Sequence, residues 1–219
     1  MISAQRAAVD LDRRLPDPAV RTHHRREAAT DPAILWAAAE SVRIGESGLL
    51  GRLVRWRVPG ATRDQTYREM FTTDPFLVLD EGEHYLLAGL CGTIWTTHPL
   101  LSPLTRPSEF REWRVPGTVR VMFAQWTEPA RDGAALVSEV RVTPVDQHAQ
   151  RRLRGPWPLI GRFEGLIGSE PLRLAVCRSQ KHVLPLPPTT LHRRLATMDG
   201  KVSTAAASLE VDTFYYDQS

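Results

Sequence analysis

The sequence predicts an α+β fold in which an antiparallel sheet packs against a long C-terminal helix. Residues 134–143 alternate in polarity, with Leu136 on one face and Glu139 on the other, which is the period-two pattern of a half-buried strand. The segment that follows, 146–168, carries bulky apolar residues at helical spacing. Between residues 65 and 126, short β-rich segments are separated by turn signals. Together these observations indicate one sheet and a final helix that lies across it, an arrangement typical of a fold with an internal cavity.

Length and composition favour one principal domain. The chain has 219 residues, of which 42% are hydrophobic and 24% are charged, close to the average of soluble globular proteins. A compact part of about 160 residues would bury roughly 70% of its unfolded-chain surface, enough for a core without disulfides or metal. We expect a flexible N-terminal arm at 1–17, the domain itself at 18–179 and a poorly structured tail at 180–219.

The charge pattern argues against a nucleic-acid partner. The net charge is +3, and nearly all basic residues are Arg, since Lys occurs only at Lys181 and Lys201. Arg is interspersed with Asp and Glu, whereas a nucleic-acid footprint clusters basic residues on one element. We interpret the two densest basic runs, 23–26 and 151–154, as solvated faces of a strand and a helix, with phosphate binding as the alternative.

No segment has the composition of a secretion signal or a membrane span. Residues 1–18 are polar, and no window approaches the ~18 consecutive apolar residues of a transmembrane helix. We therefore expect a cytoplasmic protein without integral membrane association. Cys91 and Cys177 have apolar neighbours and are expected to be buried. Two cysteines define neither a disulfide framework nor a metal site.

The N-terminal part predicts a strand and two short helices. Thr30 or Asp31 can cap a helix whose first residue is Pro32, because proline suits the first helical turn. The predicted elements are a strand at 20–29, a helix at 32–42 that ends at the Gly-rich break 45–48, and a helix at 49–56 that ends before Pro59.

From residue 65 the pattern changes to strands. Gly82 marks the clearest hairpin turn, where it provides for a positive φ angle. The strongest strand, 118–126, places Phe123 and Gln125 on one face and Trp126 on the other. Further strands are predicted at 67–72, 76–80, 85–91 and 110–115, with a surface loop at 99–107.

The C-terminal helix is predicted to be interrupted. Pro156 and Pro158 fall inside it, and proline lacks an amide hydrogen and clashes with the preceding turn. A second break is expected at 168–171, before residues 172–177. The apolar stripe between the two breaks consists of Leu159, Ile160, Phe163, Leu166 and Ile167.

This order of elements is that of the helix-grip fold, and residues 20–178 resemble the SRPBCC superfamily of START-like and birch-pollen-allergen-like domains. Uncharacterised bacterial members are the most similar. The motifs that carry the resemblance are Gly89–Trp95, Glu109–Arg111 with Pro116–Gly117, Ser138–Val142, Trp157–Ile160 and Gly165–Ile167. The resemblance implies a sheet of about six or seven strands wrapped around a long, kinked C-terminal helix, with two short helices after the first strand. The chain departs from the family at Gly168–Ser169, where members usually carry an Arg pair, and at Pro158.

An aromatic-lined cavity is the candidate site. Ligand pockets are mostly apolar with a few placed polar groups, and Gln125 and Ser138 are the polar residues on the inward strand faces. A buried amide or hydroxyl without a partner costs about 1–3 kcal/mol, so each needs a ligand, a water molecule or a backbone group. The apolar candidates are Trp36, Trp56, Trp95, Val121, Phe123, Val140, Trp157, Ile160 and Phe163. The alternative is that these side chains form an ordinary core.

The sequence offers no catalytic residue, metal site or cofactor site. The carboxylates form no convincing acid–base pair, although Glu69 could face the cavity. Glu139 and Arg141 share the outward face of a strand and are expected to form a surface pair worth under ~1 kcal/mol. The His spacing does not match a metal site, and phosphate-loop and nucleophile-elbow motifs are absent.

Three functions remain open. The first is binding of a hydrophobic or amphipathic small molecule, such as a lipid, an isoprenoid or a polyketide-like compound. The second is an enzyme of the polyketide cyclase/aromatase or dehydratase type, which the resembled superfamily includes and which needs a titratable group in the pocket. The third is a co-chaperone-like interaction module. A cavity of ~300–1,000 Å³ supports the first, and one below ~100 Å³ favours the third. The sequence carries no signal for an oligomeric state.

Overall fold

Six strands form one antiparallel sheet in the order β1-β6-β5-β3-β2, with β4 paired to β3. The computed structural model describes residues 10–58, 60–96, 100–154 and 157–181, and leaves out the side chains of 49, 50, 57 and 157–168. The strands are β1 (Val20–Ala28), β2 (Leu77–Gly82), β3 (Tyr85–Thr93), β4 (Leu100–Ser102), β5 (Val119–Ala130) and β6 (Gly133–Pro144). The predicted α+β class with an antiparallel sheet is confirmed.

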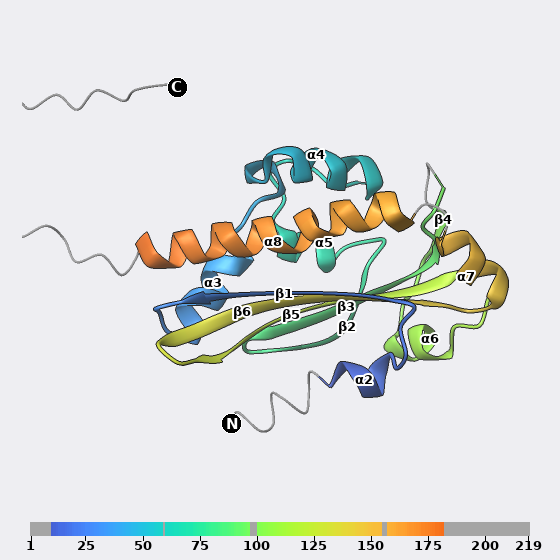
Figure 1. Ribbon diagram of the computed structural model, residues 1–219, viewed down its shortest axis with the longest axis horizontal. Helices are drawn as coiled ribbons and strands as arrows, with labels where there is room; N and C mark the ends of the chain where they lie inside the picture. Colours follow the sequence, from blue (N-terminus) through green and yellow to red (C-terminus); the bar gives the residue numbers. More distant parts are fainter. Residues whose placement is uncertain (1–9, 59, 97–99, 155–156, 182–219) are drawn as a thin grey trace, which may run out of the picture. The chain divides into compact units, whose positions relative to one another are not determined.

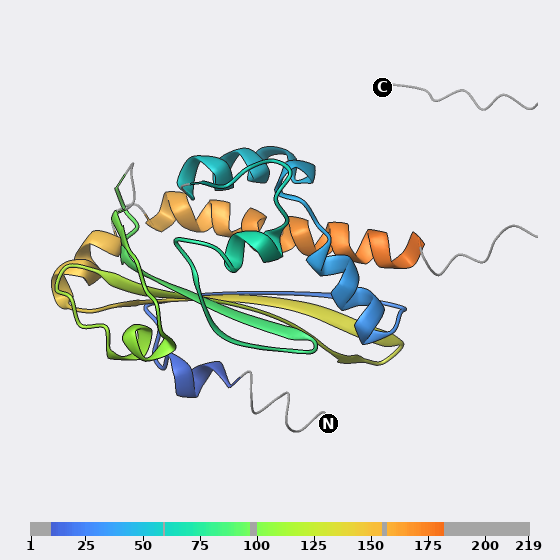
Figure 2. The same cartoon turned by 180° about the vertical axis from the view of Figure 1, so that it is seen from behind.

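Helices cover both faces of this sheet. Figures 1 and 2 show α3, α4, α5 and α8 on one side and α2 and α6 on the other, with α7 at one end. The helices are α2 (Leu11–Arg14), α3 (Pro32–Glu40), α4 (Gly48–Arg57), α5 (Tyr67–Phe71), α6 (Pro107–Glu112), α7 (Gln147–Arg154) and α8 (Trp157–Lys181), with a 3-10 helix, η1 (Ile44–Glu46), between α3 and α4. Within the described ranges, no helix combines the length and apolar character needed to cross a bilayer. The tail predicted at 180–219 lies outside the described residues, apart from its first two positions.

Local capping decides where several helices begin. Asp31 accepts a hydrogen bond from the Ala33 amide at 2.8 Å, and Pro32 is the first residue of α3, as predicted. The prediction of a strand at 67–72 is wrong, because Thr66 and Glu69 form a reciprocal capping box that begins α5. The strand predicted at 110–115 is also wrong, because Pro107 begins α6.

The C-terminal helical region consists of two helices. α7 ends at Arg154 and α8 begins at Trp157, and residues 155–156 of the first predicted break lie outside the described residues. The break predicted at 168–171 is wrong, since α8 continues through Pro171 to Lys181. Leu172 and Ala175 are fully buried against the sheet, and this packing outweighs the cost of about 3 kcal/mol for an interior proline. Cys177, predicted to be buried, is exposed on the outer side of α8, whereas Cys91 is buried.

The hairpin between β2 and β3 forms where it was predicted, but Gly82 does not adopt a positive φ angle. A Cβ atom at this position would collide with the Tyr85 ring, whose Cζ lies 2.8 Å from the Cβ position. Close approach of an aromatic ring therefore explains this glycine.

The sheet has an apolar core on each face. Leu136, Val140 and Val142 pack with α3 and α8, and Met122 and Ala124 pack on the opposite face with α2 and α6. The two faces follow the alternation predicted for β5 and β6. The sheet is therefore buried on both sides over its central strands.

Glu139 and Arg141 are not a surface pair, because the side chain of each is only 2% exposed. Their 2.6 Å contact joins a network in which Arg21 and His23 also bind Glu139, at 2.9 Å and 3.0 Å. The predicted surface pair is instead buried because α2 covers the face of β6 that carries Glu139 and Arg141. This helix lies in the N-terminal arm that was expected to be flexible. Leu11 and Leu15 of the arm are buried there. Asp12 and the Leu15 carbonyl accept hydrogen bonds from Arg141, at 2.7 Å and 3.2 Å.

Candidate functional site

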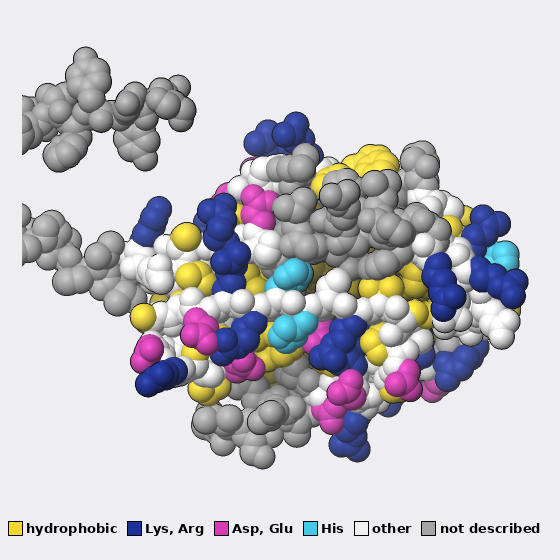
Figure 3. All heavy atoms as spheres, in the orientation of Figure 1, with side chains coloured by type: hydrophobic (Ala, Val, Ile, Leu, Met, Phe, Trp, Pro, Cys, Tyr) yellow, Lys and Arg dark blue, Asp and Glu magenta, His cyan; other side chains and the backbone are white. Residues whose placement is uncertain are grey.

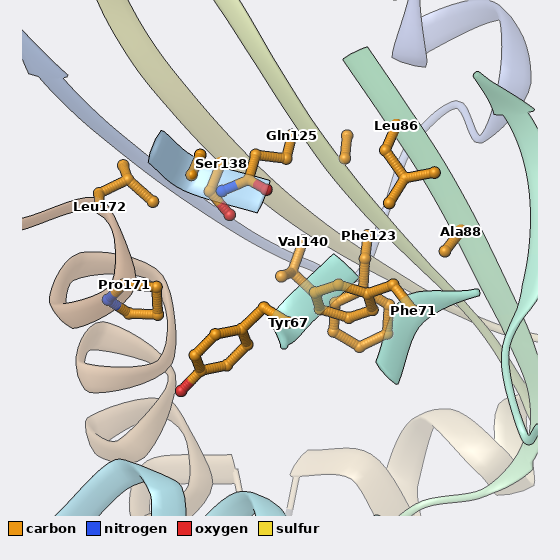
Figure 4. Close-up of a pocket in the computed structure, with 12 residues that line it drawn as sticks. Tyr67, Phe71, Leu86, Ala88, Phe123, Gln125, Ser138, Val140, Pro171 and Leu172 are labelled. Carbon is orange, nitrogen blue, oxygen red and sulfur yellow. The ribbon is translucent and has the colours of Figure 1, made fainter. Parts of the chain in front are cut away.

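A small cavity of about 40 Å³ lies between the sheet and the helices α3, α5 and α8. A volume of this size holds a few water molecules. Figure 4 shows the residues that line it. These are Ala39, Tyr67, Phe71, Leu86, Ala88, Phe123, Ala124, Gln125, Ser138, Val140, Pro171 and Leu172.

Strand register brings the two predicted polar residues together. Gln125 on β5 lies directly opposite Ser138 on β6, and the next inward pair along these strands is Phe123 opposite Val140. Directly opposed residues have Cβ atoms about 4.5–5.5 Å apart, so the amide and the hydroxyl share one place in the cavity wall. Both are half-buried, and neither has a hydrogen-bond partner among the residues that the structure describes.

Two phenylalanines of the cavity wall, Phe71 and Phe123, pack with Phe76 of the adjoining core. The Phe123 ring lies 5.1 Å from that of Phe71 and 5.3 Å from that of Phe76, measured between centroids. The ring of Phe71 is in turn 5.1 Å from that of Phe76 in an edge-to-face arrangement. Phe71 was not among the predicted site residues, and the prediction placed it in a strand at 67–72. The Thr66–Glu69 capping signature was the signal that could have found it.

Tyr67 is a buried polar residue that sequence reasoning also missed. Figure 4 shows its hydroxyl directed toward α8. Burial raises the pKa of Tyr67 to about 12, Glu170 adds to the rise, and Ser47 opposes it. The hydroxyl has no well-formed hydrogen bond within the described part of the chain, although Ser47 is near enough to influence its pKa. At neutral pH Tyr67 is therefore a protonated hydrogen-bond donor and not a base.

The structure brings some of the predicted site residues together and separates others. Trp56 is 61% exposed and does not fill the interior, because α4 lies on the far side of α8 from the sheet. The side chains of Trp157, Ile160 and Phe163 lie outside the described residues. Phe123, Gln125, Ser138 and Val140 line the cavity, Trp36 and Val121 are buried in the adjoining core, and Trp95 packs half-buried against that core.

The cavity wall contains no carboxylate, histidine or cysteine among its described residues. Glu69 caps α5 and is exposed, and hydrogen bonds from Thr66 hold the pKa of its carboxyl below the usual range. Elsewhere in the described ranges, no three His, Cys, Asp or Glu side chains converge to hold a metal ion.

Comparisons with known proteins give distant structural similarity alone. The chain matches no protein-family model and no curated protein. It is similar to the crystal structure of TTHA0849 from Thermus thermophilus, at 10% identity and a TM-score of 0.31, covering 75% of this chain and 100% of that one. It is also similar to protein MLL2253 from Mesorhizobium loti, at 13% identity and a TM-score of 0.29, covering 71% of this chain and 96% of that one. Similarity at this level carries no functional inference.

Proposed function

We propose that the domain has the helix-grip architecture of the SRPBCC superfamily and binds a small apolar or amphipathic molecule between its sheet and α8. The observation that supports the proposal is the Gln125–Ser138 pair, which faces a cavity otherwise lined by apolar side chains and Tyr67 and has no hydrogen-bond partner among the described residues. Both groups are half-buried and form no hydrogen bond with a described residue, so they are available to bond a ligand that enters the cavity.

The size of the cavity limits the ligand. At about 40 Å³ it is far below the ~300–1,000 Å³ of sites that enclose drug-sized molecules. A ligand of lipid or polyketide size therefore requires the wall to move. Pro171 lies in this wall inside α8 and has no amide hydrogen to bond the preceding turn, so α8 lacks one backbone hydrogen bond beside the cavity.

Catalysis is not part of the proposal. An acid–base reaction needs a group that gains or loses a proton near neutral pH. Tyr67 is the one titratable side chain in the described cavity wall, and its raised pKa keeps it protonated.

The second candidate function is that of a protein-interaction module, which a cavity smaller than ~100 Å³ favours. The exposed indole of Trp56 on α4 would be its central contact, because aromatic side chains dominate binding hot spots. Replacing Trp56 by Ala would then abolish capture of a partner, whereas it would leave a cavity ligand unaffected.

Replacement of Gln125 by Leu is the direct test of ligand binding. Native mass spectrometry after gentle purification should detect a bound apolar compound in the wild-type protein. The Gln125→Leu variant should bind that compound about tenfold more weakly, since it loses one hydrogen bond worth roughly 1.5 kcal/mol. Its melting temperature should not fall, because the substitution removes an unpartnered amide.

The matched control is Gln180→Leu, at an exposed position near the end of α8, which should leave affinity unchanged. Detection of the bare polypeptide alone, with no thermal shift across a panel of lipids and polyketides, would eliminate the ligand-binding function and leave the interaction module.

A further inference from the structure

Arginine side chains gather at one end of the sheet. Segments 105–120 and 143–154 contain seven Arg residues and three carboxylates, an excess of four positive charges, which exceeds the net charge of +3 of the whole chain. Figure 3 shows dark blue side chains gathered at the end where Figure 1 places α7. We call this surface the basic end; it comprises Arg106, Arg111, Arg114, Arg120, Arg151, Arg152 and Arg154.

The sheet register places these segments side by side. Leu101 pairs with Gly92, Gly92 with Val119, and Val119 with Pro144, so one row crosses four strands at this end. At about 4.8 Å per strand, the row is roughly 14 Å wide. The loop before β5 is joined to the start of α7 by Asp146, whose carboxylate accepts from the Gly117 amide at 2.7 Å.

Two of the three carboxylates at the basic end already accept hydrogen bonds within the protein. The other oxygen of Asp146 accepts from the Ala149 amide at 2.7 Å and so caps α7. Glu109 accepts hydrogen bonds from Thr105 and Arg106, which lower the pKa of its carboxyl to about 2. Glu112 is exposed and has no ion pair with a described residue. The carboxylates of Asp146 and Glu109 therefore form hydrogen bonds that stabilise the local structure.

Most arginines of the basic end form no ion pair with a described carboxylate. Arg151, Arg152 and Arg154 are exposed on α7 and have no ion pair or hydrogen bond within the part of the chain that the structure describes. Arg114 donates to backbone carbonyls, at 2.8 Å and 3.0 Å, and to no carboxylate. Burial and the nearby charge of Arg114 lower the pKa of Arg120. This surface thus has positive charge that the described residues leave uncompensated.

Two large aliphatic side chains are exposed at the same end. Leu100, at the start of β4, is 72% exposed, and Val115, in the loop before β5, is 45% exposed. A nucleic acid would compensate the charge but offers little apolar surface for the aliphatic side chains beside it. The polar–apolar boundary of an anionic bilayer accounts for both, because it attracts arginine to its headgroups and accepts aliphatic groups just below them.

We propose that the basic end docks the protein on an anionic phospholipid surface, with Arg151, Arg152 and Arg154 over the headgroups and Leu100 and Val115 entering the interface. The proposal rests on the charge distribution and on the exposed fractions of Leu100 and Val115. Docking of the basic end does not depend on whether the cavity binds a ligand.

Co-sedimentation with vesicles tests the docking. The full-length protein should bind vesicles of phosphatidylcholine containing about one third phosphatidylserine, and should not bind phosphatidylcholine alone. One arginine near such a surface contributes about fivefold to the partition coefficient, so R151Q/R152Q/R154Q should lower it on the order of a hundredfold. L100S/V115S should lower it roughly tenfold by removing the inserted aliphatic groups. The variants change exposed side chains, and their melting temperatures should match that of the wild type.

The control is R26Q/R63Q/R131Q, which removes the same charge from three exposed arginines elsewhere on the chain. It should change the partition coefficient by no more than about twofold, because distant surface charges are screened by salt.

Equal losses in the two triple variants would overturn docking through the basic end, as would equal binding to both kinds of vesicle. Tighter binding to a short DNA duplex than to anionic vesicles, lost in R151Q/R152Q/R154Q, would replace the membrane with a nucleic acid. Unchanged partitioning of L100S/V115S would overturn insertion of the aliphatic side chains.

Discussion

Replacing Glu139 by Leu is expected to lower the free energy of unfolding by about 3 kcal/mol. The substitution leaves the buried guanidinium of Arg141 with Asp12 and the Leu15 carbonyl as its remaining partners. Removing one member of a buried ion pair typically costs about 3–5 kcal/mol, and the expected loss is at the lower end because Asp12 remains. Urea unfolding at pH 7 measures it. The control is Glu128→Leu, which breaks the partly exposed Arg25–Glu128 pair and should cost under about 1 kcal/mol. Equal losses would contradict the burial of the network.

The same pair sets a pH dependence. Burial acts to raise the pKa of Glu139, but hydrogen bonds from Arg21, Arg141 and His23 outweigh burial and lower it below 4.5. A depressed carboxyl pKa stabilises the folded state above the pKa of the unfolded chain, and this stability is lost as the pH falls through the folded pKa. The stability difference between wild type and Glu139→Leu should therefore shrink below about pH 4.5. Replacing both residues, as in E139L/R141M, should restore most of the stability at pH 7.

Replacing Phe110 by Ala should destabilise the protein by about 3–5 kcal/mol, the usual cost of deleting a buried aromatic ring. Phe110, on α6, is 2% exposed in the core on the α2 side of the sheet. The ring packs against the backbone of Gly89, where an added Cβ atom would lie 2.8 Å from two ring carbons.

The Gly89–Phe110 contact makes the prediction specific. Gly89→Ala alone should be destabilising because the Phe110 ring and the Leu79 side chain, each 2.8 Å from the added Cβ, have to shift. In the Phe110→Ala background only the Leu79 contact remains, and the methyl group fills part of the vacated space. The two substitutions should therefore show a favourable coupling energy in a double-mutant cycle by chemical denaturation. Additive losses would mean that the ring does not pack on this glycine.

The central strands were predictable because their pattern is local. Alternation along 118–126 and 134–143 identified β5, β6 and the faces of Phe123, Gln125 and Ser138. Period-two alternation specifies which side chains share a face, and tight antiparallel pairing of adjacent strands then sets Gln125 opposite Ser138.

The failures have two physical causes. At 67–71, a capping box outweighed the β propensity of Tyr67 and Phe71, and this signal was local and readable. At Glu139 and Arg141 the polar face of the strand is covered by α2, more than 120 residues earlier in the chain. Alternation reports which side chains share a face, but it does not report what later covers that face. Pro171 remains inside α8 for a similar reason, since contacts distant in sequence stabilise the helix there.

Two edge strands of the sheet, β1 and β2, affect how copies of the chain can associate. The outward positions of β1 include Arg21, His23, Arg25 and Glu27, and β2 has a register shift between Val78 and Asp80 followed by Glu81. Charged and irregular borders deter a neighbouring chain from adding its own strand, which is a common route to fibrils and swapped dimers. Self-assembly by addition of a strand at β1 or β2 is therefore disfavoured.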